Sequence, residues 1–504
     1  MSLLKLPNEL LVDIAERFAC DLPASLSKCG VDVSDRPIIT ARLALRDLSW
    51  TCRRLNAIAT PLLYQNIRIH WAGELYGLAK TFLKSPHLAK FVRAIGMFVD
   101  PNTIQCVDDP HDVVVMKSLV RLISTNKNAA LIYHRVAHLF SGFQQVFDAT
   151  VSNEPEDLGS FGKLKLQGLD QQTLREFAQA TCAVILSLTS NADTLYLVTP
   201  SEGTGHYDLL MQLVHCSDSS KHGEADILLP RLERLRLAAD PRINVPLLDP
   251  DAPEAFMVGR KVRHVELFGA ILSSEFCKFT RDAWKAVETV RMDYANTNGA
   301  WWHQFCNEAR PPLKHVELSN SPCWYIVVPS DREAPGLNEA LGLCKTTLQT
   351  LSLDFDDALP VSPSFGPEGK LTCLRSMEAL SVLSIQARYL YNSLKDMKSG
   401  NICEMLPSSL QQVHFCELSE VCMEGDPWDL DAEDGPTYYD LVKRDLLQLA
   451  FKSADWLPRL EQVSLKRRHE WEAFSKVDPE FDARVTWKLL EHPNCMEMTF
   501  APKR

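Results

Sequence analysis

The chain of 504 residues has no long hydrophobic run, since no apolar segment reaches the about 18 residues that a membrane-spanning helix requires. Its first amphipathic stretch carries Glu9, Asp13 and Glu16, charges that the hydrophobic region of a secretory signal would not contain. Basic residues are outnumbered, because 53 Lys and Arg stand against 65 Asp and Glu, for a net charge of −12. This balance argues against general binding to nucleic acid or to an anionic membrane. We therefore expect neither of these as a partner.

Paired cysteine motifs are also missing. The 15 cysteines include no Cys-x-x-Cys pair, and several lie in apolar contexts, such as Cys182, Cys344 and Cys373. Scattered thiols of this kind are typical of buried, reduced cysteines. The pattern predicts an intracellular protein, in the cytoplasm, the nucleus or both.

Motifs of enzyme chemistry are absent as well. The sequence contains no Gly-x-Ser-x-Gly elbow and no dinucleotide-binding fingerprint. His134 and His138 have the spacing of a helical metal site, but Arg135 stands where the zinc-protease motif requires Glu. We expect no catalytic residue, cofactor or metal. An enzyme without a recognised motif stays open as an alternative, and it would have a deep pocket lined by titratable groups with shifted pKa values.

What the sequence does contain begins with two apolar stripes near the N-terminus. In the first, Leu10, Leu11, Ile14 and Phe18 recur at helical spacing, and Pro7 suits the first turn of a helix. The second has five members at alternating spacings of three and four: Leu45, Leu48, Cys52, Leu55 and Ala59. So small a helical unit is not expected to bury both stripes alone. One stripe is thus predicted to contact another element or another protein.

The order of these residues resembles an F-box, the helical module by which substrate receptors dock on the Skp adaptor of cullin-type ubiquitin ligases. The matching residues are Leu6, Pro7, Glu9, Leu10, Leu11, Ile14, Leu48, Cys52, Arg53, Arg54, Leu55 and Ala59, followed by the run 61–67. The match covers residues 3–67, and residues 20–41, with Pro23, Gly30 and Pro37, read as an insertion where the family has a short loop.

The resemblance implies a helical domain at residues 1–70, with Skp and a cullin scaffold as partners. The Skp contacts that it implies are Leu6, Pro7, Leu10, Leu11, Ile14, Leu48, Cys52, Leu55 and Ala59. The alternative is an ordinary helical cap on a larger domain, which would bind no Skp.

Downstream, a short apolar pattern repeats. Apolar residues occupy the first, fourth and sixth positions of eight segments: 232–237, 262–267, 287–292, 313–318, 348–353, 377–382, 410–415 and 460–465. From 232 to 410 the steps are 30, 25, 26, 35, 29 and 33 residues, close to the about 20 to 29 of leucine-rich repeats but looser. Weaker members lie at 92–97 and around Leu195 and Leu197.

Stretches with helical periodicity lie between these segments. One carries Leu174, Phe177, Thr181, Ile185 and Leu188 on one face, and another carries Leu337, Ala340, Leu341, Cys344 and Leu348. Strands alternating with helices predict an α/β fold with parallel strands, here a leucine-rich-repeat-like solenoid over residues 71–504. A non-repeating α/β domain is the alternative. Residues 424–440 hold seven acidic residues and no Lys or Arg, and predict an exposed acidic loop.

Strand alternation assigns faces to the repeat. If the fourth and sixth positions point into the core, the third, fifth and seventh, which we call the interleaved residues, are expected to be exposed on the concave side. From them we predict a substrate-binding face formed by Arg234, Arg236, His264, Glu266, Arg291, His315 and Glu317. The sequence as a whole predicts a non-catalytic subunit that docks on Skp and presents an unknown protein substrate for ubiquitin transfer. A leucine-rich-repeat scaffold unconnected with ubiquitin is the alternative.

Overall fold

The computed structural model of the chain describes residues 5–19, 36–97, 110–137, 171–199, 229–239, 262–268, 271–272, 284–293, 296–297, 299–320, 336–355, 370–391, 394–417, 438–452, 455–468, 485–489 and 495–500. The chain divides into two compact units, Met1–Val262 and Arg263–Arg504. Across those ranges, no helix has the length and apolar character needed to cross a membrane.

The first unit opens with three helices. They are α1 (Asn8–Glu16), α2 (Arg36–Thr51) and α3 (Arg53–Gln65). Cys52 alone separates α2 from α3, and its extended backbone, with φ of −161° and ψ of 165°, breaks the helical path between them. Residues 36–41 of the predicted insertion are therefore helical, whereas residues 20–35 lie outside the described part of the chain.

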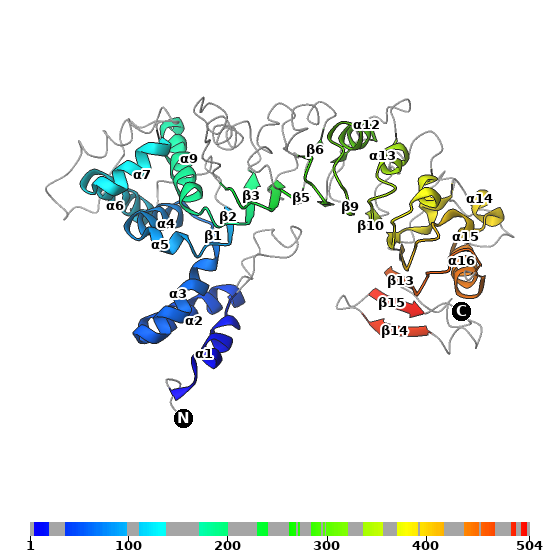
Figure 1. Cartoon of the computed structure of the whole chain (residues 1–504), viewed down its shortest axis with the longest axis horizontal. Coiled ribbons are helices and arrows are strands. Elements are labelled where there is room, and N and C mark those ends of the chain that lie inside the picture. Colours follow the sequence, from blue (N-terminus) through cyan, green and yellow to red (C-terminus); the bar gives the residue numbers. More distant parts are fainter. Residues whose placement is uncertain are drawn as a thin grey trace. The chain divides into compact units, whose positions relative to one another are not determined.

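A parallel ladder of four strands follows without a linker. Its order is β1 (Asn66–Ile69), β2 (Ala94–Met97), β3 (Thr194–Thr199) and β4 (Arg234–Ala239). The helices of this part of the unit are α4 (Ala72–Lys84), α5 (Pro86–Ala89), α6 (Pro110–Thr125), α7 (Lys127–Ala137) and α9 (Gln171–Leu188), and they lie beside the first strands (Figure 1). Phe82, Phe177 and Tyr133 fill the space between them, and all three are fully buried.

The second unit continues the same scheme with seven parallel strands. They are β5 (His264–Phe268), β7 (Thr289–Asp293), β9 (His315–Asn320), β10 (Thr350–Phe355), β11 (Val382–Ile385), β12 (Gln412–Glu417) and β13 (Gln462–Arg468). Two antiparallel strands, β15 (Cys495–Phe500) and β14 (Val485–Leu489), follow β13 in the sheet. The short strands β6 (Ile271–Leu272) and β8 (Asn296–Thr297) form a separate pair.

Helical segments connect the strands of the second unit. They are α12 (Gly299–Gln304), the π-helical turn η4 (Phe305–Ala309), α13 (Leu337–Leu343), the 3₁₀ turns η5 (Cys373–Ser376) and η6 (Ala387–Leu390), α14 (Leu394–Ser399), α15 (Ile402–Met405) and α16 (Tyr438–Lys452). Of the predicted acidic loop, residues 438–440 belong to α16, and the rest lies outside the described residues.

The predicted α/β fold with parallel strands is confirmed, and so are the core positions of the repeat. Within each unit, residues at the fourth position face one another across successive strands and are buried. They are Ile95, Leu195 and Leu235 in the first unit, and Val265, Val290, Val316, Leu351, Leu383, Val413 and Val463 in the second. The first helical face predicted between strands is present in α9, and the second is present in α13 as far as Leu343, since Cys344 and Leu348 lie beyond the end of that helix. Phe177, Thr181 and Ile185 are buried in α9, as are Leu337, Ala340 and Leu341 in α13.

One repeat is shifted from its predicted register. We expected the pattern at 377–382 with Leu380 at the fourth position, but Leu383 is the residue paired with Leu351. The strand pattern therefore runs over Leu380, Leu383 and Ile385, three residues later. The sequence misleads here because Met377 has the same spacing ahead of Leu380, and both side chains are buried. An apolar pattern that fits twice cannot indicate by itself which match is the strand.

A backbone contact recurs just before eight of the described parallel strands. One carbonyl accepts hydrogen bonds from two consecutive N–H groups of the following repeat, as Glu288 does from Lys314 and His315 and as Gln349 does from Ser381 and Val382. The other acceptors of this kind are Arg93, Asp193, Arg263, Lys314, Ser381 and Gln411. The same arrangement in both units means that these eight strands begin in the same way, whatever the length of the preceding connection.

Candidate functional site

The three N-terminal helices pack around a small shared core. Ala15 of α1, Leu45 of α2 and Ala59 of α3 are buried together, and Phe18, Leu48, Ile58, Leu62 and Leu63 pack against them. The small alanines let the helices approach closely at the centre of the group. The two predicted apolar stripes therefore bury part of their surface within the helical group, and the part that includes Leu10 stays exposed, as expected for a unit too small to bury both stripes alone.

The nine predicted Skp contacts are divided by this packing. Leu11, Leu55 and Ala59 are buried inside the helical group. Leu6, Ile14, Leu48 and Cys52 are partly exposed, and Pro7 is exposed. Leu10 presents 46% of its surface to solvent. The three buried residues hold the helices together and are not available for contact, whereas Leu6, Pro7 and Leu10 lie together at the start of α1 and remain accessible.

Two exposed apolar residues of α2 were not in the predicted set. Leu43 is 42% exposed and Trp50 is 74% exposed. They lie seven residues apart, with Arg46 and Asp47 between them, on the face of α2 opposite the buried Leu45. The Arg46 guanidinium lies 4.8 Å from the centre of the Trp50 ring and 3.0 Å from the Asp47 carboxylate. The same helical spacing that revealed the buried stripe would have revealed this second one.

The predicted substrate face is less open than strand alternation suggests. Arg234 and His315 are exposed, and His264, Arg291 and Glu317 are half-buried. Arg236 is only 6% exposed and Glu266 only 9%, so the expectation of exposure is wrong for these two. Within the ladders, Tyr196 lies beside Arg236 and Arg291 lies beside Glu266. Large side chains on adjacent strands about 4.8 Å apart cover one another, which alternation alone does not reveal.

Carboxylates surround one arginine on this face of the second unit. Arg291 Nη2 lies 3.2 Å from Glu317 Oε1. Two residues further along the same pair of strands, Ser319 Oγ donates a 2.8 Å hydrogen bond to Asp293 Oδ1. Burial raises the pKa of Glu317, the positive charge of Arg291 opposes that rise, and the negative charges of Asp293 and Glu266 add to it. Three carboxylates, Glu266, Asp293 and Glu317, thus lie near the Arg291–Glu317 ion pair on this part of the face.

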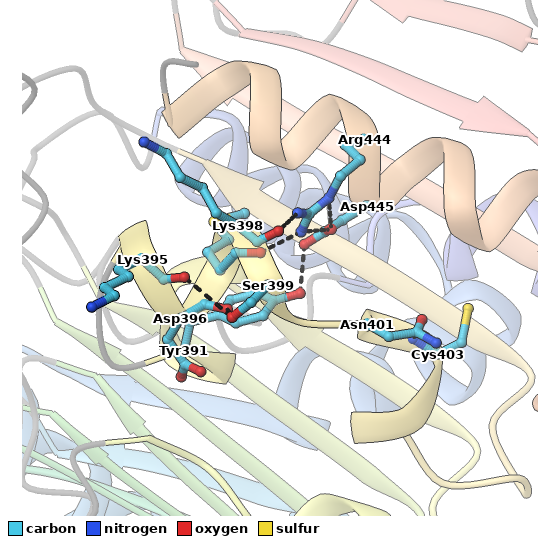
Figure 2. Close-up of polar contacts among 10 residues, drawn as sticks. Tyr391, Lys395, Asp396, Lys398, Ser399, Asn401, Cys403, Arg444 and Asp445 are labelled. Atoms are coloured by element: carbon cyan, nitrogen blue, oxygen red, sulfur yellow. Dashed lines mark hydrogen bonds and ion pairs between the residues drawn. The ribbon is translucent and has the colours of Figure 1, made fainter. Parts of the chain in front are cut away.

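A buried polar network in the second unit was not predicted at all. Tyr391 Oη donates a 2.6 Å hydrogen bond to Asp445 Oδ2, and Arg444 Nε donates a 3.0 Å bond to Asp445 Oδ1 (Figure 2). The same guanidinium donates to the carbonyls of Lys398 and Met397, at 2.8 and 2.6 Å. Since the last carbonyls of a helix lack partners within it, Arg444 caps the C-terminus of α14.

The titration of this network follows from its burial. Burial raises the pKa of Asp445, and the hydrogen bonds from Tyr391 and Arg444 oppose that rise. The pKa of Tyr391 is also raised, by burial and then by the negative charge of Asp445. These hydrogen bonds join α16 to Tyr391 and to the end of α14, so the network fastens α16 to α14.

No protein-family model matches the chain, and no curated protein matches it. Among the side chains that the structure describes, no three His, Cys, Asp or Glu groups gather as a metal site would require. Of the histidine pair noted in the sequence, His134 belongs to α7, and His138 lies outside the described residues.

Proposed function

We propose that the chain is the substrate-recognition subunit of a ubiquitin ligase built on Skp and a cullin. In this proposal α1, α2 and α3 form the F-box, and the parallel strands with their helices form a leucine-rich-repeat-like solenoid that holds a protein substrate. The observation that carries the proposal is the exposed Leu10 beside Leu6 and Pro7, on a helical group that leads directly into the ladder at Asn66.

The helical group supports the first half of the proposal because some of its apolar residues are buried while others are exposed. Its core residues pack against one another, while Leu10 remains exposed in the first turn of α1. An exposed leucine next to exposed Pro7 and half-buried Leu6 gives an apolar surface. Burying such a leucine fully against a partner is worth about 1.5 to 3 kcal/mol. This is the surface that an adaptor would cover.

The constant register supports the second half. Fourth-position residues are buried in line within each unit, three in the first and seven in the second, and the two-donor carbonyl contact recurs in both units. Repetition of one unit that buries its apolar face on its neighbours is the physical basis of a solenoid. The proposed substrate is a protein, because stacked strands line up many side chains in rows over a long surface.

Affinity purification of the full chain with identification of bound proteins tests the assignment directly. We expect Skp and cullin subunits to be retained. If a correctly folded chain retains neither, the helices are a cap on an interaction scaffold, and the ubiquitin-ligase assignment fails.

The double variant Leu10→Ala with Ile14→Ala should lose Skp capture. Truncating residues at the centre of an interface costs about 2 kcal/mol or more, which corresponds to a reduction of roughly 30-fold in affinity. The measurement is the dissociation constant for purified Skp. Leu131→Ala is the matched control, because Leu131 on α7 is a leucine that is 72% exposed and lies outside the helical group. Equal affinity for the double variant and the control would contradict the assignment.

We also propose that the interleaved residues of the second unit contact the substrate, with His264, Arg291, His315 and Glu317 as the accessible members. Arg234 is the accessible member of the first unit. Arg236 and Glu266 are too buried to serve as primary contacts, and reversing the charge of Arg236 would test folding rather than binding.

Arg291→Glu should weaken substrate capture about tenfold, or ~1.4 kcal/mol, and leave Skp binding unchanged. The new carboxylate would lie beside Glu317, so internal repulsion has to be separated from a lost contact. The charge swap Arg291→Glu with Glu317→Arg restores the internal pair and moves the positive charge by one strand. Quantitative comparison of the proteins retained by each variant distinguishes internal repulsion from a lost substrate contact. Full recovery in the swap would mean that the substrate does not contact Arg291.

A further inference from the structure

The segment before α1 is held by a residue of α3 rather than by a capping side chain of its own. Pro7 occupies the N-cap position, and no side chain caps the helix there. Arg54, in the first turn of α3, instead donates from Nε to Asn8 Oδ1 and from Nη2 to the Leu6 carbonyl, both at 2.7 Å. A single guanidinium therefore fixes both the last residue before Pro7 and the first residue of α1.

The base from which Arg54 acts is itself anchored. Leu55, the next residue of α3, is buried. Asn56 Nδ2 donates a 3.0 Å hydrogen bond to the carbonyl of Ser49 on α2, and the Asn56 N–H donates a 2.8 Å bond to the Cys52 carbonyl. These contacts hold the start of α3 in place around the break at Cys52. The guanidinium fork of Arg54 thus projects from a fixed point.

The tether acts on a helix that needs one. α1 has nine residues, and isolated helices shorter than about 12 residues are marginal in water. Leu10 lies in its first turn, next to the segment that Arg54 holds. Loss of the tether would let this turn fray, and Leu6, Pro7 and Leu10 would no longer share one arrangement.

We propose that Arg54 is a positioning residue for the adaptor interface, which it serves by holding Leu6, Pro7 and the first turn of α1 in the binding arrangement. This role rests on the proposed function. The planar guanidinium reaches two acceptors at once, which a lysine ammonium at the same position would do poorly. Arg53, the exposed neighbouring arginine, provides the matched control.

The test measures the dissociation constant of the full chain for purified Skp together with amide hydrogen exchange of the free chain. We expect Arg54→Ala to weaken binding about tenfold and Arg54→Lys to recover only part of the loss, whereas Arg53→Ala should change the dissociation constant less than twofold. Asn8→Asp keeps an acceptor for Arg54 and should retain affinity, whereas Asn8→Ala should weaken binding and add little to Arg54→Ala. Exchange should accelerate in residues 8–12 of the Arg54→Ala variant, with α2 and α3 unchanged.

Each contrary outcome points to a different failure. If the wild-type chain does not bind Skp, the adaptor assignment falls, and this role falls with it. If the wild type binds and Arg54→Ala binds equally well, or if Arg53→Ala is equally harmful, the positioning role alone is overturned. Faster exchange throughout α1, α2 and α3 would show general unfolding of the helical group and would also overturn it.

Discussion

Replacing Asp445 with alanine should lower the free energy of unfolding of the second unit by about 3 kcal/mol. The carboxylate is 1% exposed and accepts hydrogen bonds from Tyr391 and Arg444. Its removal leaves the fully buried Tyr391 hydroxyl without its acceptor and the Arg444 charge without its counterion. Arg444 keeps its bonds to the end of α14 and is 29% exposed, so the cost stays below that of a wholly buried unpaired charge.

Hydrogen exchange of the amides of α16, compared between the variant and the wild type, measures this effect where it arises. Asp455→Ala removes an exposed aspartate from the same unit and should change stability by no more than about 0.5 kcal/mol. If Asp445→Ala were as mild as this control, the network would not be what fastens α16.

Truncating Leu351 to alanine should destabilise the second unit by about 2 to 5 kcal/mol. Leu351 is 0% exposed and is paired with Val316 on one side and Leu383 on the other. The lost methyl groups leave a cavity in the middle of the ladder, which neighbours in register on both sides cannot collapse to fill.

Ser352→Ala is the control for Leu351→Ala because Ser352 is the next residue of β10 and is only half-buried. We expect its effect to stay within about 0.5 kcal/mol. Urea unfolding, together with amide hydrogen exchange in β9, β10 and β11, measures the stability change of both variants. A serine variant as harmful as the leucine variant would mean that the two faces of the strand have been assigned the wrong way round.

The ladder could be predicted because its signal is local and repeated. A buried residue at the fourth position, a second two places later and a third three places earlier are properties of six consecutive residues. Ten strands provide independent copies of this pattern. Only around Met377 did the sequence contain two equally good matches, and there the hydrogen-bonded neighbours, not the pattern, determine that Leu383 faces Leu351.

Burial of the interleaved residues could not be predicted by the same means. Alternation indicates the side of a strand on which Arg236 lies, but its exposure depends on Tyr196, which belongs to another strand 40 positions earlier in the chain. The network around Asp445 is more remote still, because Tyr391 precedes it by 54 residues with the acidic stretch between them. Contacts of this kind depend on which elements become neighbours after folding.

The N-terminal helices show an intermediate case. Their buried stripes follow from spacing, but the break at Cys52, which divides the second stripe between α2 and α3 and folds its two halves onto each other, does not. The tie from Arg54 to Leu6 and Asn8 spans 46 to 48 residues and has no local signature.

The carbonyl contact before the strands is the same from repeat to repeat, whereas the connections between strands differ in length. This difference bears on how such a chain can change over evolution. Lys314 and Glu288 meet across adjacent repeats 26 residues apart, and His414 and Ser464 meet across a connection of 50. Doubling the length of a flexible connection costs only about 0.6 kcal/mol of closure entropy. New sequence can therefore enter between strands, and be selected for new contacts, while the rows of side chains on the sheet keep their neighbours.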